Sequence, residues 1–139
     1  ASRLFPDRIS GIHELLIKHI ECELEGYSFK LCDIHPLAAI EDVANRTDVI
    51  RHKERKFGRG CVGAWRENQA GIRCGFVAAL NRFRGTLTAN EFLFGGDPGY
   101  ADFALAGVLE NYLYPEANDL DDQPWLLDWL KRWDGITFK

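Results

Sequence analysis

The residues best placed for chemistry in this sequence lie in one glycine-rich stretch, FLFGGDPGYADFALAG, which spans residues 92–107. Asp102 is the one carboxylate in the apolar segment that follows the glycines. This pattern is compatible with three roles. The glycines could cradle a phosphate, Asp102 could act as a catalytic acid, or Asp102 could simply stabilise the start of a helix.

The capping role fits the spacing best. Neither phosphate-binding pattern, G-x-x-x-x-G-K-[ST] or G-x-G-x-x-G, is present. The nearest acid on the same predicted helix is Glu110, which lies roughly 12 Å away along the axis and is too far to share one reacting bond with Asp102. With Gly99 as the N-cap, Asp102 falls at the third helical position, where a carboxylate can accept the N-cap amide and favour the positive helix end. Glycine supplies no hydroxyl, so Gly99 and Asp102 form half of a capping box.

The other polar clusters do not combine into an active site or a metal site. The basic run from Arg51 to Arg59 is interrupted by Glu54 and is typical of a solvated helix face. His13 and His19 are six residues apart, so they do not share a helix face as two ligands of one metal would. No Ser, Cys or Lys has an evident activating base. We therefore assign no catalytic residue and no metal ligand to this chain.

Composition and charge indicate one globular domain over residues 1–139. The sequence is 46% hydrophobic and 27% charged, with a formal net charge of −4. This charge gives no electrostatic support to a nucleic-acid partner, and no apolar run is long enough for a membrane span. The four cysteines lack metal-site spacing and are expected to be reduced thiols. We expect a cytoplasmic protein that binds neither nucleic acid nor membrane.

Hydrophobic periodicity predicts an all-α fold. A first helix is expected from Asp7 to about Glu25, ended by Gly26, and the next residues, 27–38, are predicted to be an apolar connector. An interrupted helical region follows over residues 38–57. A single helix of about seven turns is predicted from Val62 to Leu87, with glycines that let a neighbouring helix approach. A buried central helix over 100–114 and a final amphipathic helix over 123–135 complete the chain.

Three segments carry a resemblance to a known family. The stretch FLFGGDPGYADFALAG resembles the start of the central helix in the C-terminal domain of glutathione transferases, although Gly99 stands where members usually have Ser or Thr. KERKFGRG, residues 53–60, is similar to the RE..FG element of the β-etherase-like branch, which includes bacterial lignin etherases and fungal relatives. Lys53 replaces the arginine often found there. PWLLDWLKRWDG is similar to the family's terminal helix, so the likeness runs from about Pro6 to Ile136.

The resemblance implies a helical bundle of the glutathione transferase C-terminal type. In that family a thioredoxin-like domain precedes the helical one, binds the co-substrate glutathione and carries the residue that stabilises its thiolate. The helical half provides the hydrophobic substrate wall and much of a homodimer interface. By this resemblance no catalytic or cofactor-binding residue is expected here, and the ligand of this half is an aromatic small molecule. The candidate wall residues are His19, Ile20, Tyr27, Phe29 and Trp65.

Two other functions stay open at this point. The same domain type is also fused to translation and structural proteins, which favours a noncatalytic interaction or scaffold module. A carrier that holds hydrophobic compounds without reaction is the third possibility. Each candidate wall residue could also be an ordinary core residue.

Overall fold

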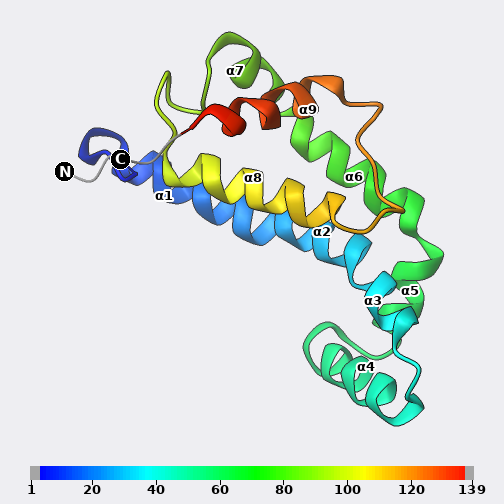
Figure 1. Ribbon diagram of the computed structural model, residues 1–139. Helices are drawn as coiled ribbons and strands as arrows, with labels where there is room; N and C mark the ends of the chain where they lie inside the picture. Colours follow the sequence, from blue (N-terminus) through cyan, green and yellow to red (C-terminus); the bar gives the residue numbers. More distant parts are fainter. Residues whose placement is uncertain (1–3, 137–139) are drawn as a thin grey trace.

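The computed structural model describes residues 4–136, and within them the fold is all-α, as predicted (Figure 1). The elements in chain order are η1 (Asp7–Ile9), α1 (Ser10–His19), η2 (Ile20–Leu24), α2 (Glu25–Cys32), α3 (Ile34–Ala39), α4 (Val43–Phe57), α5 (Cys61–Glu67), α6 (Gln69–Asn81), α7 (Arg84–Ala89), α8 (Tyr100–Leu113), α9 (Pro124–Lys131) and η3 (Arg132–Gly135). An isolated bridge between Phe92 and Gly95 is the sole β-pairing in this part of the chain.

The sequence predicted that the first helix ends at Gly26, but the helical rod continues past this residue. It passes from α1 through the π-helical turn η2 into α2, so Gly26 and the first part of the predicted connector are helical. After a turn at Asp33, the rest of the connector lies in α3. The side chains of Ser28, Leu31 and Cys32 are buried, and α2 packs against both α6 and α8. This tertiary burial outweighs the roughly 1 kcal/mol that a glycine costs inside a helix.

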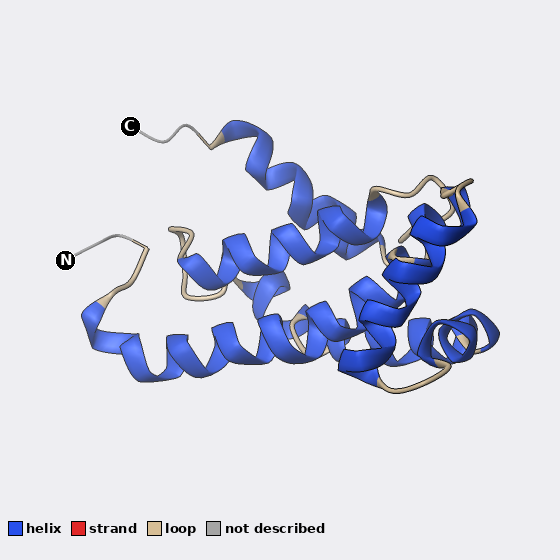
Figure 2. Ribbon diagram, turned by 90° about the horizontal axis from the view of Figure 1, so that it is seen from below, coloured by secondary structure: helices blue, strands red, loops and turns tan. Residues whose placement is uncertain are grey.

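Helix α8 is the central helix, and its predicted span is confirmed to within one residue. Its buried side chains are Ala101, Asp102, Leu105, Val108, Leu109 and Tyr112. Figures 1 and 2 show α8 running alongside the rod formed by α1 and α2, with α9 on the other side of it. The main core fills the space between these helices and α6.

The predicted seven-turn helix is wrong as a single rod, because the chain bends twice within it. Asn68 leaves helical geometry between α5 and α6, and Arg82 and Phe83 form the turn before α7. The Asn68 side chain folds over Gly71, occupying the space that a Cβ there would need. The inward face was nevertheless predicted correctly, since Trp65, Phe76, Phe83 and Leu87 are all buried with others of that stripe.

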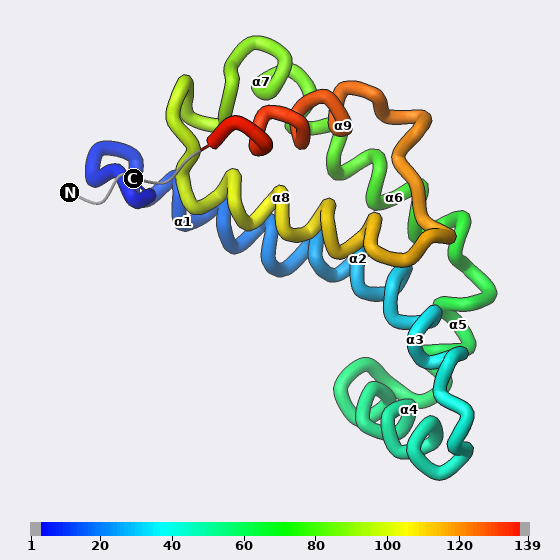
Figure 3. The backbone as a smooth tube through the Cα atoms, viewed as in Figure 1, coloured from blue at the N-terminus to red at the C-terminus, as the bar shows by residue number. Residues whose placement is uncertain are grey.

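Helix α4 extends away from the main body (Figures 1 and 3). None of its residues is buried; it packs against α3 and α5, and its last residue, Phe57, meets the Phe29 ring of α2. A second, smaller core beneath it consists of Leu37, Cys61, Val62 and Trp65. The interrupted helical region predicted over 38–57 therefore corresponds to the end of α3, a short break, and α4.

The final helix forms as predicted, with Pro124 in its first turn. Arg132 of η3 holds it to α7, since Nη1 donates to the carbonyl oxygens of Leu87, Asn90 and Glu91. All four cysteines are free, and Cys32 and Cys61 are buried. Across residues 4–136, no helix has the length and apolar character needed to cross a membrane.

Candidate functional site

The most promising concave surface lies between α2 and α4. This cavity, which we call the α2–α4 cavity, has a volume of about 450 Å³. Its lining combines aromatic rings with charges of both signs: Glu21, Cys22, Glu25, Gly26, Phe29, Asp33, Lys53, Lys56 and Phe57. Such a mixture of apolar surface and a few polar groups is typical of small-molecule sites.

Two aromatic rings, Phe29 and Phe57, form the apolar wall of this cavity, and a third ring, Trp65, packs behind them. The Phe29 ring centroid lies 5.0 Å from that of Phe57 and 5.5 Å from that of Trp65. Phe57 and Trp65 are also 5.5 Å apart, in an edge-to-face arrangement. Because Trp65 is 7% exposed, it supports the other two rings from behind. Edge-to-face packing of this kind fixes ring positions beyond what burial alone provides.

The KERKFGRG segment holds α4 in the position that creates the cavity. Lys53 Nζ donates to Asp33 Oδ2 on the other wall. Glu54 Oε1 accepts the Gly60 amide at 2.7 Å, which stabilises the turn after α4. Gly58 and Gly60 have φ angles of 98° and 76°, which side chains other than glycine rarely adopt.

Lys56 is the cation of this cavity that remains available to a ligand. Its Nζ lies 5.2 Å from the Phe57 ring centroid, and its side chain is exposed. Lys53, in contrast, is already paired with Asp33. An anionic group bound beside the Phe29 and Phe57 rings would therefore meet Lys56.

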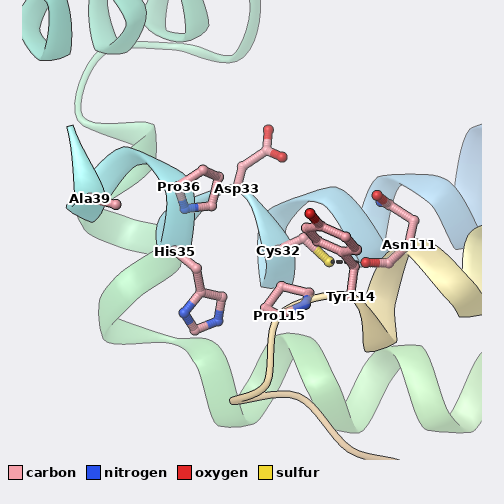
Figure 4. Close-up of a pocket in the computed structure, with 8 residues that line it drawn as sticks. All are labelled: Cys32, Asp33, His35, Pro36, Ala39, Asn111, Tyr114 and Pro115. Atoms are coloured by element: carbon pink, nitrogen blue, oxygen red, sulfur yellow. Dashed lines mark hydrogen bonds between the residues drawn. The ribbon is translucent and has the colours of Figure 1, made fainter.

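A second cavity, which we call the Cys32 cavity, shares Asp33 with the first one (Figure 4). It has a volume of about 330 Å³ and a mainly apolar lining: Cys32, Asp33, His35, Pro36, Ala39, Asn111, Tyr114 and Pro115. The Asp33 carboxylate points away from His35 in Figure 4. Tyr114 is 89% exposed, so its ring forms an open wall.

The Cys32 thiol is a buried hydrogen-bond donor in surroundings that disfavour its thiolate. Its Sγ donates to the Asn111 carbonyl oxygen at 3.2 Å. Burial raises the pKa of the Cys32 thiol above its ordinary value, against the opposing effect of Ser28 and Asn118. Because the thiolate is the reactive form, this environment suppresses reaction at Cys32.

The five sequence-predicted wall residues do not form one surface. Phe29 and Trp65 meet in the aromatic cluster described above. Tyr27 instead faces α6, where a Cβ on Gly75 would lie 2.8 Å from its ring. His19 lies 6.0 Å from the Phe83 ring and pairs with Glu23 at 2.9 Å. Ile20 is fully buried in the main core, so it can support a wall only from within.

The predicted capping residues lie together at the start of α8. Asp102 is fully buried, and its Oδ2 accepts the Gly99 amide at 2.9 Å. Its Oδ1 accepts the Leu93 amide at 2.8 Å, a long-range contact that local spacing does not show. Burial raises the pKa of Asp102, and the two amides and His13 oppose that shift.

Sequence reasoning missed the residues that pair with Lys53 and with Phe29. Asp33 and Phe57 gave no signal of their own, because each acts through a residue on another helix. The signal that could have found Lys53 is the quoted family element, which places a cation before Glu54. His13, considered in the sequence only as a metal ligand, packs against the start of α8 instead.

The comparisons with known proteins give one match. Residues 63–132, about half of the chain, match the family model described as "Glutathione S-transferase, C-terminal domain". The matched segment runs from α5 into η3 and includes the whole of α8. Neither the curated proteins nor the solved structures contain a significant match to this chain. With its all-helical architecture and this match, the chain belongs to the glutathione S-transferase C-terminal domain family.

Proposed function

We propose that this chain is the substrate-binding half of a glutathione transferase that acts on aromatic electrophiles or aryl ethers. The family match supports the helical half of such an enzyme, and the quoted KERKFGRG element favours the β-etherase-like branch. A preceding thioredoxin-like domain would bind glutathione and stabilise its thiolate. That thiolate attacks carbon, a C–S bond forms, and the bond to the leaving phenolate or halide breaks.

The observation that carries the proposal is the aromatic wall of the α2–α4 cavity. Phe29 and Phe57 line the cavity, Trp65 fixes both rings, and Lys56 lies at its edge. Flat apolar surface suits an aromatic substrate, and the free ammonium group suits the negative charge that develops on a leaving phenolate. Tyr27 and His19 would then act as supports on the opposite face of the rod, and Ile20 as a support within it.

A homodimer in the cytoplasm is part of the same proposal. Ile12 and Leu15 of α1 are 67% and 68% exposed, which leaves an uncovered apolar strip on the first helix. A second subunit or the thioredoxin-like domain would bury this strip. Sedimentation of the two-domain protein checks the dimer, and a monomer at every concentration tested would contradict it.

A binding experiment on this chain tests the aromatic wall. Titration with a naphthalene-sulfonate dye should saturate at one dye per chain, because among residues 4–136 the cavity offers one aromatic wall and one cation outside an ion pair, Lys56. Phe29→Ala should weaken binding at least about fivefold, which corresponds to about 1 kcal/mol of lost aromatic contact.

Tyr114→Ala is the matched control, since Tyr114 is an aromatic residue of the Cys32 cavity. It should leave the affinity unchanged. If Tyr114→Ala weakens binding and Phe29→Ala does not, the substrate wall lies in the Cys32 cavity. If no saturable binding occurs, the interaction or scaffold module becomes the better account.

A further inference from the structure

The start of α8 is completed by a residue from another helix. Gly99, the N-cap, has no side chain to accept a hydrogen bond from the first turn. His13 of α1 lies there instead, and its Nε2 accepts the Ala101 amide at 3.0 Å. The Tyr100 amide is bonded to the Leu4 carbonyl and the Asp102 amide to that of Gly99. The first turn of α8 is thus satisfied, with the imidazole in the role of a capping side chain.

The His13 ring lies close to the position that a side chain on Gly99 would take. A Cβ on Gly99 would lie 3.2 Å from His13 Cε1 and 3.4 Å from Nε2. A serine at this position would therefore be in tight contact with the imidazole, which would have to shift by a few tenths of an ångström. The absence of a side chain at Gly99 thus leaves room for His13 to cap the helix.

The capping bond requires a neutral imidazole. Because Nε2 accepts, the ring proton lies on Nδ1, which has no hydrogen-bond partner among residues 4–136. Protonation would turn Nε2 into a donor facing the Ala101 N–H. It would also place a positive charge at the positive end of the helix.

His13 is buried, with an aromatic ring and a buried carboxylate as neighbours. The residue is 1% exposed, and the Phe94 ring contacts it edge-on at 5.0 Å. The buried titratable neighbour is Asp102, whose two oxygens already accept backbone amides. On the elements around it, Asp7, Arg8, Glu14, Lys18, Asp97 and Tyr100 are exposed. His19 of α1 is half-buried and pairs with Glu23, and Tyr112 is buried in the last turn of α8.

We propose that His13 is a pH-dependent N-cap, which joins α1 to α8 when neutral and releases the start of α8 when protonated. Burial lowers the pKa of His13 from 6.5, while Asp102 acts in the opposite direction. A lowered pKa means that the unfolded chain binds the proton more readily. The contribution of His13 to the free energy of unfolding should therefore be fully present above about pH 6.5 and decrease as the pH drops below it. The unfolding constant should rise by at most about tenfold per pH unit.

Asp102 contributes to the pH dependence of stability with the opposite sign. Burial raises its pKa above 3.8, so the folded state takes up a proton there first, and falling pH favours the folded state through this group. An absolute stability curve would mix both groups. The difference between the wild type and a variant that caps without titrating isolates the imidazole.

The experiment compares this chain with His13→Gln, His13→Ala and the double variant His13→Ala with Gly99→Ser. The glutamine oxygen can accept the Ala101 amide but cannot take up a proton in this range. Thermal unfolding and amide hydrogen exchange at Ala101 are followed between about pH 7.5 and pH 5. In the wild type, the NMR titration of the His13 ring nitrogens is recorded over the same range.

The proposal expects Ala101 to lose exchange protection as His13 is protonated in the wild type. His13→Gln should keep this protection at both pH values, His13→Ala should lack it, and the added Gly99→Ser should restore it. The proposal is overturned if His13 takes up a proton while Ala101 stays protected. It is equally overturned if His13→Gln, or the double variant should the glutamine variant not fold, retains the wild-type loss of stability in acid.

Discussion

Among single residues, Asp102 ties two separate amides to the start of α8. Its two oxygens accept the Leu93 and Gly99 N–H groups inside a fully buried site. Asp102→Ala would leave both amides without a partner, and we expect a loss of roughly 1 to 3 kcal/mol in the free energy of unfolding. Urea unfolding measures this difference.

The control is Asp97→Asn, a change at an exposed carboxylate in the turn before the same helix. It should alter stability by less than about 0.5 kcal/mol. Equal stability of Asp102→Ala and the wild type would show that water or a backbone rearrangement replaces the lost acceptor.

The sequence predicted the part of this site that depends on local spacing. Asp102 lies three residues after Gly99, and this separation alone indicates a carboxylate over the N-cap amide. His13 is 88 residues from the amide that it accepts, so no pattern within one segment could show it. The Lys53–Asp33 pair was invisible for the same reason, because its members lie on different helices.

At the scale of helices, the contact between α2 and α6 depends on a missing side chain. The Tyr27 ring lies against Gly75, where an added Cβ would be 2.8 Å from the ring carbon Cε1. Gly75→Ala should therefore lower the free energy of unfolding by about 1 to 3 kcal/mol, as overpacking of a core does.

Gly107→Ala, a substitution in α8, should instead raise the free energy of unfolding. A Cβ on Gly107 would meet no heavy atom within 4 Å, and the residue lies within α8. Alanine there should stabilise the chain by about 0.5 to 1 kcal/mol through helix propensity. If both substitutions stabilise, the Tyr27 ring moves aside freely and does not fix the distance between α2 and α6.

Helix breaks were harder to predict than helix faces. Gly26 looked like a stop because glycine ends many helices, yet burial of Leu31 and Cys32 keeps the chain helical beyond it. Asn68 gave no stop signal, although its side chain needs the space left by Gly71. The buried face was still predicted correctly, because it depends on which residues are apolar and not on where the helix bends.

For the whole molecule, periodicity was sufficient to predict an all-α fold around α8. The position of α4 was not predictable, because this helix buries none of its own side chains and is held by the Lys53–Asp33 pair and the Phe57 ring. The α2–α4 cavity follows from that position, since Lys53, Lys56 and Phe57 line it. The sequence could therefore suggest Phe29 and Trp65 as members of a wall, but it could not show that Phe57 completes it.

The most direct test of the account is glutathione-dependent turnover by the protein in which a thioredoxin-like domain precedes this chain. The proposed function predicts saturable conversion of an aryl ether or an activated aryl halide. Phe29→Ala should raise KM several-fold with little change in kcat, because its ring binds the substrate and its transition state equally. Glutathione binding without conversion of either substrate class would contradict the account and leave the carrier or the scaffold module in its place.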